Sequence, residues 1–311
     1  MLKFVITYSD STQKTADNVL TAVINAEEGV PADDLTITLP FDGSLSKNAE
    51  RISVFDGDEE IFTGQTDEII NIKNSDGAIT KITARSPAGQ LLDNEAEPLT
   101  YVNPDAEYIW KKHLEPFGIK SFEADSTPFY GNLSISKGMT HWQVFYNYCI
   151  NRYGHKPRIT GDGKAYFTGF ESDEKVIFSE SETAYCSLKE NLKRCRLISE
   201  VKLKLSQYKG YTGSIKNLNP ECENISRVRY VNAVSDKTNI NTADNIISQS
   251  NSDSYSITLE CHGCHIGLLG RKAQVCDDVF GTKDDLIIRK IKYTLGKNGE
   301  NTTVTLGKEK F

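Results

Sequence analysis

Apolar side chains that recur at every second position are the strongest constraint in this sequence. Near the start, Leu2, Phe4 and Ile6 occupy every second position. In residues 35–39, leucine or isoleucine alternates with threonine. An extended chain repeats every two residues, so each apolar set would lie on one face of a strand. The first hundred residues are therefore predicted to form β-strands rather than helices.

Turn signals divide this first region into short strands. Asp42-Gly43, Asp56-Gly57 and Asp76-Gly77 are dipeptides typical of tight hairpins, because glycine accepts the positive φ that such turns need. Further strands are predicted at residues 52–55, 60–63, 67–73 and 78–85. We expect residues 1–100 to form an antiparallel barrel or sandwich.

The pattern becomes helical after residue 100. Asn103 is predicted to cap a helix with Pro104 in its first turn, and residues 116–118 (Pro-Phe-Gly) should end it. A second helix should begin at Thr140, with Gln143 completing a capping box. A hairpin is expected over residues 157–170, so residues 101–180 are predicted to form a small α/β domain.

Strand patterns return in the last third. Val201, Leu203 and Leu205 alternate with polar residues, and residues 287–306 form a hairpin pattern around Lys-Asn-Gly at 297–299. Residues 213–242 are polar and poorly periodic, so a long loop is predicted there. The predicted fold class is thus mixed and β-rich (α+β), with β domains at 1–100 and 181–311 flanking the α/β domain.

Charge and hydropathy exclude several classes of protein. The chain has 311 residues, 36 Lys and Arg, 43 Asp and Glu and a net charge of −7, which argues against a general nucleic-acid binder. Residues 1–100 carry 7 basic and 18 acidic residues, a net −11, whereas the remaining 211 residues carry a net +4. This asymmetry indicates either more than one domain or acidic loops on a single domain.

The sequence shows no signal for export or membrane insertion. No stretch approaches the roughly twenty apolar residues of a transmembrane helix, and the N-terminus turns polar too early for a signal peptide. We therefore expect folding in a reducing cytoplasm, where the cysteines stay thiols. There are seven of them: Cys149, Cys186, Cys195, Cys222, Cys261, Cys264 and Cys276.

Residues 261–265 (Cys-His-Gly-Cys-His) form the sharpest local motif. This spacing matches the attachment site of c-type haem, and Cys261 and Cys264 with either His262 or His265 are candidate zinc ligands. The absence of an export signal disfavours haem, the lack of a second cysteine pair disfavours zinc, and on a strand the two cysteines would face opposite sides unless Gly263 bends the chain. Two half-buried thiols beside a turn is the favoured interpretation, so no metal or cofactor is predicted.

Other candidate chemistry is weaker. A basic run extends along Lys189, Lys193, Arg194, Arg196, Lys202, Lys204 and Lys209. It is the best candidate for binding an anionic partner, although a strand edge protected by lysines explains it more simply. His113 and His141 lie on predicted helices among apolar residues, which favours satisfied histidines in or beside a core. No phosphate-binding loop and no His-Glu-x-x-His motif is present.

Several landmarks together resemble one family. They are residues 54–57 (Val-Phe-Asp-Gly), 62–64 (Phe-Thr-Gly), 83–87 (Thr-Ala-Arg-Ser-Pro) and 91–96, then 110–113, 138–144, 161–167 and the hairpin at 287–306. In this order and spacing they resemble the baseplate hub proteins of phage tails, including those of Mu-like phages and contractile bacteriocins. The resemblance covers most of the chain and is weakest over residues 207–250.

The resemblance implies a structural role. It implies a homotrimer in which each chain supplies two tube-like β-barrel domains, giving a pseudo-sixfold ring between the sixfold tail tube and the threefold central spike. The implied partners are the tail tube or tube-initiator protein, the spike, baseplate wedge proteins and the tape measure, without catalytic residues, specific nucleic-acid binding or membrane insertion. It also implies assembly in the bacterial cytoplasm into a virion tail or tail-like particle.

Two other function classes remain open from sequence alone. One is a β-rich redox protein that binds metal or haem through residues 261–265, which absorption spectra and metal analysis would detect. The other is a cell-wall hydrolase that uses paired carboxylates, since acidic residues cluster at Asp56, Asp58, Glu59 and Glu60. A wall-turbidity assay would detect the hydrolase.

Overall fold

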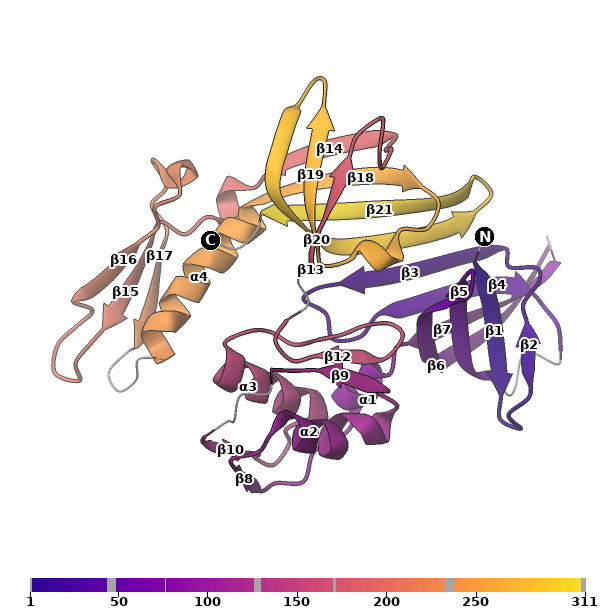
Figure 1. The fold of residues 1–311 in the computed structure, drawn as a ribbon, viewed down its shortest axis with the longest axis horizontal. Coiled ribbons are helices and arrows are strands. Elements are labelled where there is room, and N and C mark those ends of the chain that lie inside the picture. The colour runs from indigo at the N-terminus through magenta and orange to yellow at the C-terminus, as the bar shows by residue number, and fades with distance from the viewer. Residues whose placement is uncertain are drawn as a thin grey trace. The chain divides into compact units, whose positions relative to one another are not determined.

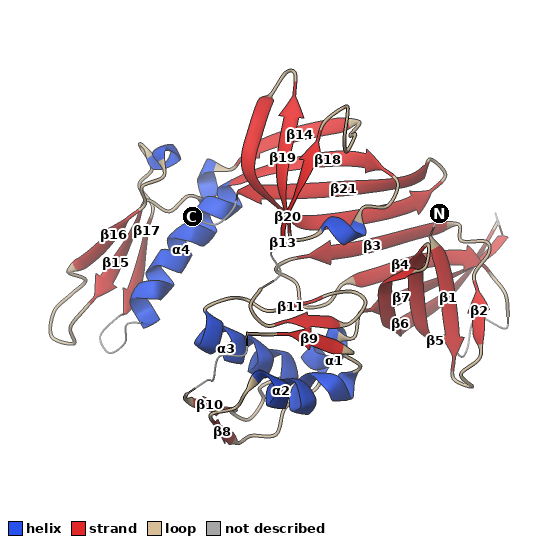
Figure 2. Cartoon of the chain, viewed as in Figure 1, coloured by secondary structure: helices blue, strands red, loops and turns tan. Residues whose placement is uncertain are grey.

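The computed structural model describes residues 2–43, 49–75, 77–125, 130–169, 172–232 and 238–308. The chain forms two compact units. Unit 1 comprises Met1–Ser172, Cys261–Gly270 and Arg289–Thr303, and unit 2 comprises Asp173–Glu260, Arg271–Ile288 and Val304–Phe311. Strands predominate over helices (Figures 1 and 2), which confirms the predicted mixed, β-rich class.

Unit 1 contains an antiparallel sheet built mainly from the first hundred residues. Its strands are β1 (Lys3–Tyr8), β2 (Gln13–Thr15), β3 (Thr21–Glu27), β4 (Asp34–Pro40), β5 (Ala49–Asp56), β6 (Glu59–Asn74) and β7 (Gly77–Arg85). The strand order is β3-β4-β7-β6-β5-β1-β2, and β3 also pairs with residues 290–295 of β20 (Gly281–Gly296). Phe4, Ile6, Leu35 and Ile37 are all buried, as the alternation predicted.

The structure corrects one strand boundary in this sheet. The strands predicted at 60–63 and 67–73 are a single strand, β6, and its register against β7 shifts between Thr66 and Glu68. Such a bulge moves the following side chains to the opposite face, so the alternation is interrupted while the strand continues. The turn at Asp56-Gly57 is present with φ of +61° at Gly57, whereas Asp76 lies outside the described residues.

A second core of unit 1 combines helices with short strands. Its elements are α1 (Ala88–Asp93), β8 (Thr100–Val102), α2 (Ala106–Ile109), η1 (Trp110–Leu114), η2 (Glu115–Phe117), β9 (Ser121–Glu123), β10 (Asn132–Ser134), α3 (His141–Tyr153), β11 (Arg158–Ile159) and β12 (Lys164–Tyr166). The side chains of Val144, Phe145, Tyr148 and Phe167 are fully buried in it. The predicted capping box of Thr140 and Gln143 is formed at the start of α3.

The first helix begins two residues later than predicted. Asp105 is its cap and accepts a hydrogen bond from the backbone N–H of Tyr108, at 2.7 Å. Asn103 has a φ of +48°, and its side chain accepts a hydrogen bond from Gly131 N–H instead. Gly118, with φ of +84°, ends the segment as predicted.

Unit 2 contains further antiparallel ladders. Its strands are β13 (Ser172–Phe178), β14 (Ser187–Leu192), β18 (Tyr255–His262), β19 (Arg271–Asp277), β20 and β21 (Gly299–Lys308), of which β18, β20 and β21 also contribute residues to unit 1. β14 pairs with β18, β19 pairs with β20, and β20 and β21 are neighbours, as expected for the predicted hairpin. Within the described ranges no ladder closes a barrel.

Unit 2 also contains a small module of three strands and one helix. Strands β15 (Glu200–Lys204), β16 (Gly213–Lys216) and β17 (Val228–Asn232) form a separate sheet in the order β16-β15-β17, and α4 (Thr238–Ser254) packs against it (Figure 1). The long loop predicted over 213–242 is therefore wrong: it holds two strands and the start of a helix, while 233–237 lie outside the described residues. No helix in the part of the chain that the structure describes has the length and apolar character needed to cross a bilayer.

Candidate assembly surfaces

The motif at residues 261–265 lies where β18 ends. Cys261 is fully buried, and Gly263 bends the chain with φ of +84° while its N–H donates to the carbonyl of Glu300. Cys264 is half-buried, and burial raises the pKa of its thiol to about 11. The ring of His265 has its Nε2 atom 2.9 Å from the carbonyl oxygen of His262.

This arrangement shows the predicted bend but gathers no metal ligands. Among the described residues, no group of three or more His, Cys, Asp or Glu side chains is arranged to hold a metal ion. The structure joins none of the seven cysteines, all of which lie in described residues, in a disulfide.

His113 and His141 form a contact inside the α/β core. Their Nδ1 atoms are 2.9 Å apart, and Nε2 of His113 lies 3.1 Å from the hydroxyl of Tyr101. His113 is 2% exposed, and burial together with the nearby His141 lowers its pKa to about 4. The pair is therefore neutral and hydrogen-bonded at neutral pH, as expected for histidines of a core.

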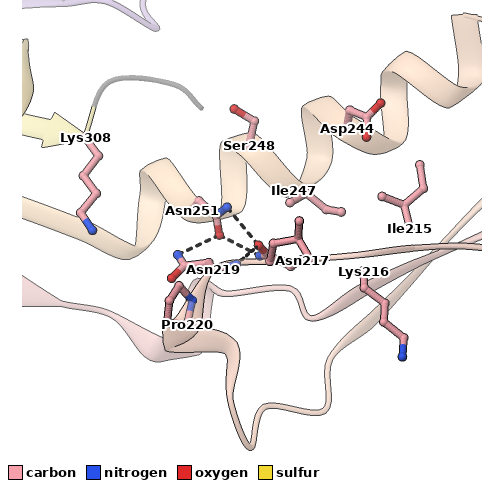
Figure 3. A pocket seen from close by; sticks show the side chains of 11 residues that line it. Ile215, Lys216, Asn217, Asn219, Pro220, Asp244, Ile247, Ser248, Asn251 and Lys308 are labelled. Atoms are coloured by element: carbon pink, nitrogen blue, oxygen red, sulfur yellow. Dashed lines mark hydrogen bonds between the residues drawn. The ribbon is translucent and has the colours of Figure 1, made fainter.

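A groove of about 590 Å³ lies between β16 and α4 in unit 2 (Figure 3). Ile215 and Ile247 contribute apolar walls, and three asparagines meet at one end. Asn217 donates to Oδ1 of Asn251 at 2.7 Å, Asn219 donates to the same oxygen at 3.2 Å, and Asn251 donates back to Asn217 at 3.1 Å. Because these amides satisfy one another, the cluster fixes the connection between β16 and the short helix η4 (Pro220–Cys222) to α4 rather than presenting free groups to a substrate.

The opposite side of the same sheet carries a different set of side chains. Val201 and Leu203 are buried in a cluster with Ala243 of α4, so the alternate residues Lys202 and Lys204 lie on the uncovered face. Cross-strand pairing places residues of β16 and of β17 beside these lysines on the same face. We call it the basic face and define it by Lys202, Lys204, Ser214, Lys216 and Tyr230.

The basic face changes the interpretation of the basic run. Lys202 and Lys204 were predicted to protect a strand edge, but β15 is the middle strand of its sheet. Lys189 does lie on β14, at the end of its strand order. The aromatic neighbour of Lys202 could not be identified from the sequence, because Tyr230 lies beside Lys202 only through the parallel pairing of β15 with β17.

Acidic residues gather at the β5–β6 turn in unit 1. Asp58 and Glu59 are exposed beside Gly57, and Glu60 forms an ion pair with Lys120 at 2.5 Å. Glu60 is thus held by a structural contact and is not paired with another carboxylate for acid–base chemistry. We call Asp58 and Glu59 the acidic turn.

No family model and no curated protein sequence matches the chain. Solved structures do match. A tail protein from Neisseria meningitidis MC58 has a TM-score of 0.76 at 16% identity, covering 99% of this chain and 96% of that one. The 43 kDa tail protein of prophage MuSo2 from Shewanella oneidensis also has a TM-score of 0.76, at 15% identity, covering 99% and 98%.

A more distant match extends beyond phages. A component of the type VI secretion system of E. coli, described as structurally similar to the bacteriophage T4 tail proteins gp27 and gp5, has a TM-score of 0.57 at 11% identity and covers 94% of this chain and 74% of that one. The likeness to the Neisseria and Shewanella tail proteins spans nearly the full length of each of them. The chain therefore has the fold of phage tail proteins, which confirms at the level of fold the resemblance predicted from its sequence.

Proposed function

We propose that this protein is the structural hub of a baseplate, in a phage tail or a phage-tail-like particle such as a contractile bacteriocin. In this role it forms a trimeric ring that joins the sixfold tail tube to the threefold central spike. The observation that carries the proposal is the shared fold, since one superposition covers 99% of this chain and 96% of a phage tail protein.

The symmetry of the proposed ring follows from two β regions in each chain. Three subunits present six similar edges only when each supplies two similar domains. We assign these to residues 1–100 and 181–311, as tube-like β-barrel domains, with the α/β domain at 101–180 outside the ring. The antiparallel ladders of β1–β7 and of β14, β18, β19, β20 and β21 support this assignment.

The proposed role is passive and needs no cofactor. Its partners are the tail tube or tube-initiator protein, the central spike, baseplate wedge proteins and the tape-measure protein. A chain of a Francisella PdpA-VgrG complex matches this chain with a TM-score of 0.58, which supports a role among interacting tail or spike proteins. We further propose that the protein carries out no reaction, binds no specific nucleic acid, inserts into no membrane and assembles in the bacterial cytoplasm.

The mass of the native oligomer tests this function. Native mass spectrometry of the purified chain, alone and with its tube and spike proteins, should show three protomers of 34.7 kDa or trimerisation when the spike is added. Persistent monomers in the presence of both partners would contradict the proposal. If the chain binds the spike with a copy number other than three, the trimeric ring is contradicted but a role in the tail is not.

A further inference from the structure

The basic face carries lysines that are not neutralised within the module. Lys202 and Lys204 lie two residues apart on one strand, about 7 Å along its axis, so their charges repel each other. Neither they nor Lys216 forms an ion pair with any described residue. The carboxylate of Glu200, beside them, accepts a hydrogen bond from the hydroxyl of Ser214 at 2.6 Å.

Aromatic side chains border these lysines. Tyr230 is 61% exposed and packs edge-on against Tyr211, with ring centroids 4.9 Å apart. Tyrosine is enriched at protein interfaces, because it offers a large contact area at low entropic cost and keeps a polar tip. Exposed tyrosines next to unpaired lysines are typical of a surface that docks on an acidic partner.

The charge of the module contrasts with that of the rest of the chain. Residues 194–254, which contain the module, hold nine Lys and Arg and six Asp and Glu, a net +3, whereas residues 1–100 hold a net −11. Opposite charges of this size steer two surfaces together and fix their orientation. The same polypeptide therefore carries both a basic surface and an acidic one.

The acidic turn provides a specific counterpart. Asp58 and Glu59 project from a tight hairpin that Gly57 closes with φ of +61°. Within the described residues neither carboxylate takes part in an ion pair. The acidic turn thus presents two carboxylates without an ion pair to any described residue, opposite in charge to the two lysines of β15.

We propose that the basic face of one copy docks onto the acidic turn of a second copy. Such a contact is heterologous, since two different surfaces meet, and a heterologous contact closes into a ring when its rotation permits. The inference rests on the proposed function, because it names the surface through which the subunits of the ring recognise each other. Tyr230 and Tyr211 form the apolar part of this contact. The lysines attract the acidic turn of the second copy and fix its orientation on the basic face.

The size of the face sets the expected strength. Five residues on three strands cover on the order of 200 Å², by strand dimensions of about 3.3 Å per residue and 4.8 Å between strands. Stable interfaces bury roughly 800 Å² per partner. The basic face is thus one part of the contact, and its loss should weaken assembly rather than abolish it.

Nucleic acid is the other polyanion that lysines and tyrosines bind. The net charge of −7 on the chain disfavours nucleic acid as the partner of the basic face, as do the acidic residues of unit 1. Binding of a DNA oligonucleotide that depends on Lys202 and Lys204 would therefore overturn the proposal. Fluorescence anisotropy with a labelled oligonucleotide checks this directly.

A charge swap tests the contact. We would compare the wild-type chain with K202E/K204E, D58K/E59K and the quadruple variant that combines them, by mass photometry over a range of concentrations. Each double variant should raise the dissociation constant of the oligomer at least tenfold, and the quadruple variant should restore it. K137E/K297E is the matched control, because both lysines are exposed and lie outside the basic face.

The outcomes separate this proposal from the proposed function. Circular dichroism and thermal melts first verify that each variant is folded. A trimer that none of the substitutions weakens, or double variants that the quadruple variant does not restore, would overturn the docking surface and leave the hub intact. Monomers in every preparation, including those with tube and spike proteins, would overturn both.

Discussion

The Nδ1 atoms of His113 and His141 lie 2.9 Å apart in the α/β core, so one ring nitrogen donates its hydrogen and the other accepts it. Two doubly protonated rings offer only donors at that contact, and they would repel each other. His113 lies on the segment after α2, and His141 is the first residue of α3. A single proton shared between the rings therefore joins two helical segments.

This contact predicts a loss of stability in mild acid. Burial lowers the pKa of His113 from 6.5 to about 4, so the folded state disfavours the charged ring. The contribution of His113 to the free energy of unfolding is fully present above pH 6.5. It is lost as the pH falls toward 4, because in this window the unfolded chain binds more protons than the folded one. The expected loss is about 1.4 kcal/mol per pH unit within this window.

Urea unfolding of the wild type and of His113→Phe between pH 7.5 and 4.5 checks the prediction. Carboxylates titrate in both proteins, so the difference between the two curves isolates the histidine. The wild type should lose stability more steeply than the variant. Parallel curves would show that the ring contact does not control the pH dependence.

The buried ion pair between Arg158 and Asp33 should stabilise unit 1. Nη1 of Arg158 also donates to the carbonyl of Val30 at 2.8 Å, so the side chain anchors the β3–β4 connection to β11. Arg158→Met leaves a buried carboxylate unpaired and should cost about 3–5 kcal/mol. Adding Asp33→Leu should recover part of this loss, because no uncompensated charge then remains.

A double-mutant cycle by urea unfolding at pH 7 measures the pair. The two substitutions should couple by at least about 1 kcal/mol. Additive effects would show that the ion pair does not contribute as a unit. Arg152→Met, which removes an arginine that donates to the hydroxyl of Tyr148 at 2.8 Å, is a control for the loss of an arginine without a buried carboxylate partner.

The cysteines should differ in reactivity according to their exposure. Cys186 and Cys195 are exposed, whereas Cys149, Cys222 and Cys261 are buried. Alkylation of the native protein with iodoacetamide, followed by peptide mass spectrometry, should label Cys186 and Cys195 first. Early labelling of Cys149 would contradict the packing of α3, because burial raises the pKa of that thiol well above its ordinary value.

The asparagine cluster should hold the small module of unit 2 together. Asn251→Ala removes the acceptor that the half-buried Asn217 and Asn219 share, although Asn217 still donates to the carbonyl of Ile198, so the loss should be about 1 kcal/mol. Hydrogen exchange should then accelerate in β16 and α4 and stay unchanged in β3 and β4. Ser248→Ala, on the same helix and in the same groove, is the matched control and should behave as wild type.

Alternation and capping chemistry predicted much of unit 1. Leu35, Ile37 and Leu39 are buried on one face of β4, and Thr140 with Gln143 caps α3 as expected. These signals are local, since a strand repeats every two residues and a cap involves neighbours. The bulge in β6 escaped prediction because its register depends on pairing with β7.

Long-range contacts explain the larger errors in unit 2. Residues 213–232 lack a clear period, yet β16 and β17 form because each pairs with β15, whose buried Val201 and Leu203 pack against α4. Leu205, predicted to continue that strand, lies beyond its end and is 48% exposed. The basic face could not be identified from sequence for the same reason, since three separate segments build it.

A single-particle reconstruction of the chain bound to its spike protein tests the central claim most directly. The account predicts three copies around one axis, each contributing two similar β regions to a pseudo-sixfold inner wall. A complex with one copy, or a ring whose wall is formed by only one β region of each chain, would contradict it.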